Sequence, residues 1–112
     1  MSHNVFQACI DACIVCGVQC NHCVSECLNE EDLQIMTRCI ELDRECSLAC
    51  FSAAQLMSLG GEFATSFCEN CAAICEACAE ECEKHDAAHC KRCAEACRIC
   101  AAECRKMINV HV

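Results

Sequence analysis

Apolar residues recur along the chain at alternating gaps of three and four, and in many of these positions the residue is cysteine. The first run contains Cys9, Cys13, Cys16, Cys20, Cys23 and Cys27. Such spacing is typical of the buried stripe of a helix that packs against other helices, where Leu or Ile usually lies. It predicts a helix over about residues 5–28, with Asn4 as a candidate N-cap.

The pattern predicts three further helices, over about residues 30–58, 62–84 and 87–108. Asn29 is a candidate cap for the second, because acidic residues follow it directly. Leu59-Gly60-Gly61 interrupts the pattern and is expected to end that helix. Asp86 is the candidate cap for the fourth helix. Four helices with short connections and no proline predict an all-α, antiparallel up-down four-helix bundle with a Cys-lined core, forming one domain over residues 1–112.

The cysteines follow the same rhythm in the second half of the chain. The third helix carries Cys68, Cys71, Cys75, Cys78 and Cys82, and the fourth carries Cys90, Cys93, Cys97, Cys100 and Cys104. The second helix has only Cys39, Cys46 and Cys50. We expect Ile35, Leu42, Ala53 and Met57 to complete its inward stripe.

The first two helices also carry a second apolar stripe. On the first it contains Ile10, Ile14, Val24 and Leu28, and on the second Leu33, Met36, Ile40, Leu48 and Phe51. A helix with two apolar faces usually buries both. We therefore expect a homo-oligomer that packs through these two helices.

Charge and hydropathy indicate which binding partners and which cellular compartment to expect for the protein. The formal net charge is −9 with only 8 Lys and Arg, which disfavours nucleic acid, because phosphate binding needs clustered basic residues. The N-terminus lacks the pattern of a signal peptide, and we expect no apolar stretch of the roughly 18 residues that a membrane span needs. A cytoplasmic protein with reduced thiols is the expectation.

Several uses of 19 inward cysteines must be weighed. As mere core filler they would be costly to protect from oxidation. A disulfide scaffold fits poorly, because the count is odd and the chain is helical rather than loop-rich. Zinc sites need four tetrahedral ligands, and several Cys₄ sites stacked in one narrow core would accumulate negative charge. Iron–sulfur clusters usually take their cysteines from loops.

Cu(I) fits the pattern best. It is soft and selects thiolate and thioether ligands. Two cysteines four residues apart lie on one helix face, so one ion can bridge such a pair without bending the backbone. Each Cu⁺ that displaces one thiol proton leaves the charge of the core unchanged. This predicts a capacity of about one ion per thiol.

On these repeated motifs, the chain resembles the bacterial copper storage proteins, and specifically their cytosolic, signal-less branch. The resemblance spans nearly the whole chain and is weaker in the second helix, where cysteines are fewer. It implies a four-helix bundle that binds many Cu(I) ions through thiolates inside the bundle, and a tetramer of such bundles.

The ends of the bundle are where ions would enter. One end is expected to gather His85, His89 and Met36 with Cys27, Cys82 and Cys90. The opposite end is expected to gather Met57 and Met107 with Cys9, Cys68 and Cys104. Imidazole and thioether groups both suit copper, so His85, His89 and Met57 are candidate ligands. His22 also adjoins a cysteine, but it lies off the stripe and is expected at the surface.

No arrangement of residues indicates an enzyme. The sequence has no evident nucleophile–base pair and no glycine-rich phosphate loop, and a redox CxxC enzyme needs an exposed thiol of low pKa. Zinc or thiol buffering and thiol redox chemistry remain the alternatives to copper storage.

Overall fold

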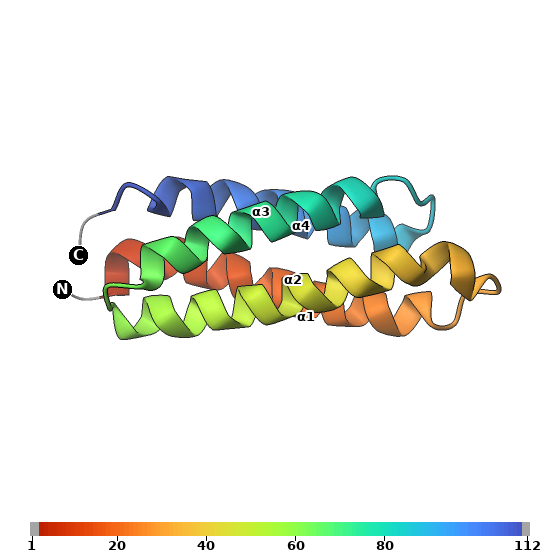
Figure 1. Cartoon of the computed structure of the whole chain (residues 1–112), viewed down its shortest axis with the longest axis horizontal. Coiled ribbons are helices and arrows are strands. Elements are labelled where there is room, and N and C mark those ends of the chain that lie inside the picture. The colour runs from red at the N-terminus through yellow and green to blue at the C-terminus, as the bar shows by residue number, and fades with distance from the viewer. Residues whose placement is uncertain (1–2, 111–112) are drawn as a thin grey trace.

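The computed structural model describes residues 3–110 of the chain, with side chains from Val5 onward. Four long helices form an antiparallel bundle of 49 × 18 × 17 Å, preceded by a short 3₁₀ turn, as Figure 1 shows. Their bounds are α1 Gln7–Cys27, α2 Leu33–Leu59, α3 Ala64–Cys82 and α4 Ala88–Met107, and the turn, η1, is His3–Phe6. The predicted all-α fold with its Cys-lined core is confirmed.

Each helix packs against two neighbours, α1 and α3 both lying against α2 and α4. The α1–α2 and α3–α4 connections lie together at one end of the bundle, here named the loop end (Figure 1). The α2–α3 connection lies at the other end together with the two chain termini, and this is named the terminal end. The antiparallel order therefore fixes which cysteines share an end.

The predicted helix caps are wrong. The observed N-cap residues are Phe6, Asp32, Phe63 and Ala87. Asn4 lies within η1 and Asp86 precedes the α4 cap by one residue. Asn29 cannot cap α2, because its N–H still bonds to the carbonyl of Glu26 in a turn that follows α1. Of the four caps, Asp32 is the one whose side chain accepts a backbone N–H, that of Ile35 at 3.4 Å.

The predicted break after α2 is confirmed at Gly60. Its φ of 68° is left-handed, a conformation that glycine adopts without a Cβ penalty. Its N–H bonds to the carbonyls of Leu56 and Met57, which satisfies two of the open carbonyls at the helix end. The chain can then reverse direction into α3.

The inward stripe of α2 differs from the predicted one by one residue at two positions. Ile35 is 61% exposed, and Met36 occupies the buried position instead. Leu42 is buried as predicted, but Asp43 beside it is fully buried and continues the three-and-four rhythm. The buried stripe is therefore Met36, Cys39, Asp43, Cys46, Cys50, Ala53 and Met57.

Helix α1 requires a correction to the expectation that no segment suits a membrane. Among the described helices it is the one whose length and composition pass the test for a membrane span. Six of its 21 residues are cysteines, and all six are fully buried against the other helices. Of the apolar window, 39% is buried inside the bundle, and the core helix of a bundle passes the same test.

Candidate metal centre

All 19 cysteines are free and fully buried, and they form one column along the axis of the bundle. Sγ atoms from different helices approach one another closely throughout it. Cys46 of α2 lies 3.5 Å from Cys75 of α3, and Cys16 of α1 lies 3.7 Å from Cys97 of α4. The helical rhythm places every cysteine at the centre because each falls on an inward stripe.

The thiols gather in overlapping groups of four whose sulfur atoms lie within 4.8 Å of one another. Five of these groups are Cys23/Cys27/Cys39/Cys90, Cys20/Cys78/Cys93/Cys97, Cys16/Cys20/Cys46/Cys97, Cys16/Cys46/Cys50/Cys75 and Cys13/Cys71/Cys100/Cys104. The three middle groups share members. The other two are joined to them by short contacts, with Cys71 Sγ 3.7 Å from Cys50 Sγ, and with Cys82 Sγ 3.5 Å from Cys39 Sγ and 4.0 Å from Cys78 Sγ. The column is continuous rather than a set of separate sites.

Two thiols at the loop end, Cys27 and Cys90, are protonated before metal binds. Burial, followed by the charges of neighbouring thiols, raises the pKa of Cys27 and of Cys90 above the ordinary thiol value. Both thiols are therefore neutral at physiological pH. Metal binding must displace their protons, which couples uptake to proton release.

His89 brings an imidazole to the column at the loop end. Its Nδ1 lies 3.5 Å from Cys23 Sγ, 3.6 Å from Cys90 Sγ and 3.8 Å from Cys27 Sγ. Its Nε2 lies 2.8 Å from a Glu30 carboxylate oxygen, and the residue is only 8% exposed. Nε2 of the ring thus faces the Glu30 carboxylate, while Nδ1 faces three thiols.

The neighbours of His89 also influence its charge. Burial lowers the pKa of its imidazole, but contacts with Cys23 and Glu30 raise it by more, so the net pKa lies above its ordinary value. The nearby carboxylate favours the protonated ring.

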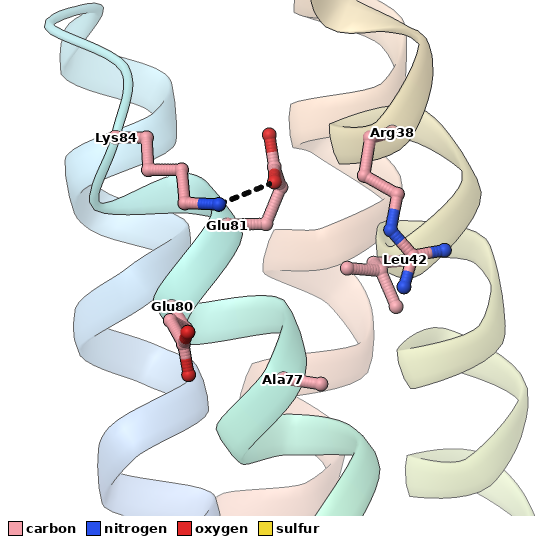
Figure 2. A pocket seen from close by; sticks show the side chains of 6 residues that line it. All are labelled: Arg38, Leu42, Ala77, Glu80, Glu81 and Lys84. Atoms are coloured by element: carbon pink, nitrogen blue, oxygen red, sulfur yellow. Dashed lines mark hydrogen bonds and ion pairs between the residues drawn. The ribbon is translucent and has the colours of Figure 1, made fainter.

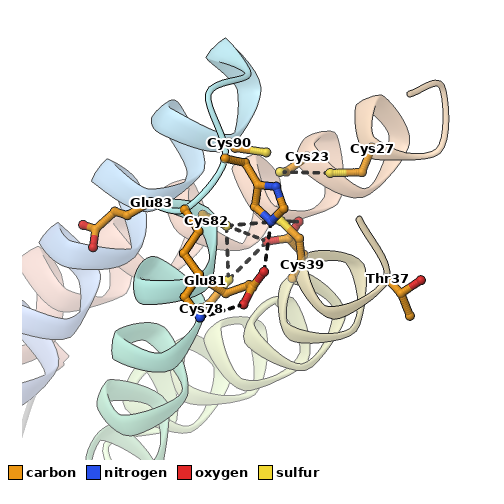
Figure 3. A network of polar contacts seen from close by, with 12 residues as sticks. Cys23, Cys27, Thr37, Cys39, Cys78, Glu81, Cys82, Glu83 and Cys90 are labelled. Atoms are coloured by element: carbon orange, nitrogen blue, oxygen red, sulfur yellow. Dashed lines mark hydrogen bonds and ion pairs between the residues drawn. The ribbon is translucent and has the colours of Figure 1, made fainter. Parts of the chain in front are cut away.

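His85 is placed differently, although it belongs to the same connection. Its Nε2 lies 2.9 Å from a carboxylate oxygen of Glu81, and in the described part of the chain it makes no hydrogen bond to a thiol. Figure 3 shows labelled thiols of all four helices turned toward one another near this end, while Glu83 points outward. Of the two histidines predicted at this end, His89 contacts the thiols of the column and His85 contacts Glu81 instead.

The terminal end is closed by apolar side chains. Phe6 and Met57 are fully buried there, beside Cys9, whose Sγ lies 3.6 Å from that of Cys104. Met107 is partly buried against the same core. Phe6 was not predicted to close this end, yet it precedes Cys9 by three residues and so falls on the same stripe.

A second residue missed by the sequence analysis is Asp43. Its Oδ1 accepts hydrogen bonds from Cys78 at 3.1 Å and Cys93 at 3.2 Å. Burial, with the charges of Cys93 and Cys78, raises the pKa of this carboxyl far above its usual range. The sequence feature that could have indicated its burial is the spacing of four, three and four residues that joins Cys39, Asp43, Cys46 and Cys50.

The surface grooves hold different chemistry. One of about 170 Å³ lies between α2 and α3, lined by Arg38, Leu42, Ala77, Glu80, Glu81 and Lys84 (Figure 2). Lys84 Nζ lies 3.5 Å from a Glu81 oxygen, so the charges partly neutralise one another. The residues that line this groove include no thiol.

Comparison with known proteins gives a consistent result. The family model described as copper storage protein matches residues 2–109. A curated Bacillus subtilis relative, the uncharacterized cysteine-rich protein YhjQ, is 48% identical over 83 residues, which are 74% of this chain and 77% of the relative.

Solved structures agree over almost the full length. The apo copper storage protein 3 from Bacillus subtilis is 47% identical, with a TM-score of 0.84 over 92% of this chain and 98% of that chain. A cytosolic copper storage protein from Streptomyces lividans, solved with five coppers, is 30% identical, with a TM-score of 0.92 over 98% of this chain and 97% of that chain. With its column of buried thiols and this match over nearly all its residues, the chain belongs to the copper storage protein family.

Proposed function

We propose that the chain stores Cu(I), about one ion per thiol, inside its bundle. The observation that carries this is the continuous column of free, fully buried thiols, with sulfur atoms of different helices 3.5–3.8 Å apart. The proposed ligands are Cys9, Cys13, Cys16, Cys20, Cys23, Cys27, Cys39, Cys46, Cys50, Cys68, Cys71, Cys75, Cys78, Cys82, Cys90, Cys93, Cys97, Cys100 and Cys104.

Charge favours a monovalent cargo for this column. A Cu⁺ ion that replaces one thiol proton leaves the interior as neutral as before. A Zn²⁺ ion held by four thiolates carries two net negative charges. A stack of such sites would place several uncompensated charges in a core that has no lysine or arginine among the buried residues described. Many Cu(I) ions can therefore share the column where many Zn²⁺ ions cannot.

Ions enter at the loop end under this proposal. His89 Nδ1 faces Cys23, Cys27 and Cys90, so it can hold an incoming Cu(I) and pass it to those thiolates. His85 would first have to leave Glu81. At the opposite end Met57 is a candidate thioether ligand for the last ions in the column.

Anaerobic titration of the reduced, metal-free protein with Cu(I) tests the storage proposal. We expect thiolate-to-copper absorbance to rise to about 19 equivalents per chain, in competition with a strong Cu(I) chelator. Replacing Cys46 and Cys50 together with alanine should lower the endpoint by about two ions, since each thiol balances one ion. Saturation with four or five Zn²⁺ and weak copper binding would favour zinc buffering instead.

We also propose that the chain assembles as a homotetramer through α1 and α2. Ile14 and Leu48 of the second apolar stripe are exposed, and Leu48 is 70% exposed. The contact between the two helices is close, because a Cβ on Gly17 would lie 2.8 Å from the ring of Phe51. A second copy would bury these apolar side chains.

Light scattering of the purified protein tests the assembly. We expect the mass of four chains, and a Leu48→Glu variant should dissociate because it buries a charge in the interface. The matched control is Ile99→Glu, at an exposed apolar position on α4, which should leave the mass unchanged. A monomer of the unmodified chain at micromolar concentration would rule out this assembly.

The Streptomyces lividans relative is described as cytosolic, and we propose the same compartment for this chain, where thiols stay reduced. The proposed activity is reversible binding without a catalytic step, and copper ions are the proposed partners. The net charge of −9 gives no support for binding nucleic acid.

A further inference from the structure

We propose that Asp43, with Cys78, Cys82 and Cys93, forms a single site for a divalent cation, Zn²⁺, within the thiol column. Cys78, Cys82 and Cys93 are also among the proposed Cu(I) ligands, so Zn²⁺ at this site would compete with Cu(I) for three thiols. The site is argued from Asp43 and does not require that the rest of the column stores copper. Three helices contribute, because Asp43 lies on α2, Cys78 and Cys82 on α3, and Cys93 on α4.

The distances between the donor atoms suit one tetrahedral ion. Asp43 Oδ1 lies 3.1 Å from Cys78 Sγ, 3.2 Å from Cys93 Sγ and 3.5 Å from Cys82 Sγ. Cys78 and Cys82 Sγ are 4.0 Å apart. In a tetrahedron with Zn–S near 2.3 Å and Zn–O near 2.0–2.2 Å, donor atoms lie about 3.5–3.8 Å apart. These four distances are within about 0.5 Å of the tetrahedral values, and Cys93 Sγ lies within 4.8 Å of Cys78 Sγ.

The chemistry of the donors separates this position from the rest of the column. A carboxylate oxygen is an accepted ligand of Zn²⁺, together with thiolates, whereas Cu(I) selects sulfur. Asp43 occupies the position between Cys39 and Cys46 where a further cysteine would have continued the thiol stripe of α2. The sequence thus replaces a soft ligand with a hard one at one level of the column.

The surroundings of Asp43 also call for a cation. In the described part of the chain, its carboxyl oxygens accept hydrogen bonds from the thiols of Cys39, Cys78, Cys82 and Cys93, which are weak donors. A fully buried carboxyl group with only such partners is poorly compensated. With the ion bound, Cys39 can still donate to Oδ2 at 3.7 Å and support the ligand from behind.

A lone divalent site avoids the electrostatic cost that excludes a stack of them. Its net negative charge has no like site beside it, and the neighbouring thiols can remain protonated and neutral. One Zn²⁺ per chain is therefore compatible with a column that otherwise prefers monovalent ions.

The test uses the reduced, metal-free full-length protein with Zn²⁺ and with Co²⁺ as a spectroscopic probe. We expect one Zn²⁺ per chain to survive gel filtration, and one Co²⁺ to give intense tetrahedral d–d bands with sulfur-to-cobalt charge transfer. Asp43→Asn, which preserves side-chain shape, should weaken Zn²⁺ binding about tenfold or more and shift the Co²⁺ bands. Glu41→Gln, which removes an exposed carboxylate from the same helix, is the matched control and should keep both properties.

The outcomes are distinct. The site is supported if Asp43→Asn loses Zn²⁺ binding while Glu41→Gln retains it, with both variants remaining helical. Equal Zn²⁺ binding by Asp43→Asn and the unmodified chain overturns it, as does uptake of several equivalent Zn²⁺ ions with an all-sulfur Co²⁺ spectrum. Copper capacity is measured separately, so a chain that keeps one Zn²⁺ but takes few Cu(I) ions would refute storage and leave this site standing.

Discussion

Replacing His89 with alanine is expected to slow Cu(I) uptake from a chelating donor about tenfold or more, while the final capacity stays near one ion per thiol. The reason is that His89 is the imidazole within 3.5–3.8 Å of three thiols at the loop end. Without it, an arriving ion must be captured by the thiols alone. Stopped-flow absorbance of copper–thiolate formation measures the rate.

Two other histidines provide matched controls for this variant. His22 lies on α1 beside Glu26, with its side chain 48% exposed, and His85 is held by Glu81. His22→Ala and His85→Ala should both load at about the rate of the unmodified chain. Equal rates for all three variants would mean that copper enters without an imidazole, and the loop-end route would have to be abandoned.

Replacing Phe6 with alanine is expected to lower the free energy of unfolding by about 3–5 kcal/mol, the usual cost of removing a buried aromatic ring. Phe6 is fully buried at the terminal end, so its removal leaves a cavity beside the last thiols. Urea unfolding of the reduced, metal-free protein, at one fixed protein concentration, measures the change.

Phe63→Ala is the comparison for Phe6→Ala. The ring of Phe63 is largely exposed at the start of α3, so its loss should change stability by about 0.5 kcal/mol or less. If the two variants lost the same stability, the ring of Phe6 would not be closing the terminal end. Copper uptake through the loop end should be similar in both.

The helices and the inward thiols were predictable because one periodicity determines both. Cysteines at gaps of three and four lie on a single face of a helix, and only the interior of a bundle can bury four such faces. Helix ends were less predictable, since the turn after Cys27 continues to Glu30 before Asp32 caps α2. Local residue preferences do not reveal how far a preceding helix unwinds.

The sequence analysis missed site residues that are polar, because a pattern of apolar positions does not predict that a polar side chain is buried. A carboxylate is rarely buried without a partner, so the pattern favoured Leu42 over Asp43 as the next inward position. In the sequence, His89 differs from His85 by adjoining Cys90, which made it the stronger candidate. Only the fold shows that Glu81 lies against His85 and that thiols lie against His89. Side-chain partners that come from distant helices leave no local signal.

Because the sulfur atoms lie so close together, neighbouring thiols of the metal-free protein can be oxidised to disulfide bonds between helices. Cys39 and Cys82, on different helices, have sulfur atoms 3.5 Å apart, whereas a disulfide bond measures about 2.05 Å. Each two-electron oxidation of such a pair would tie two helices together and remove two thiols, so the bundle could remain folded yet hold less metal. Thiolates committed to a bound ion are not free to react with one another. The metal-free form is therefore the one that depends on a reducing compartment.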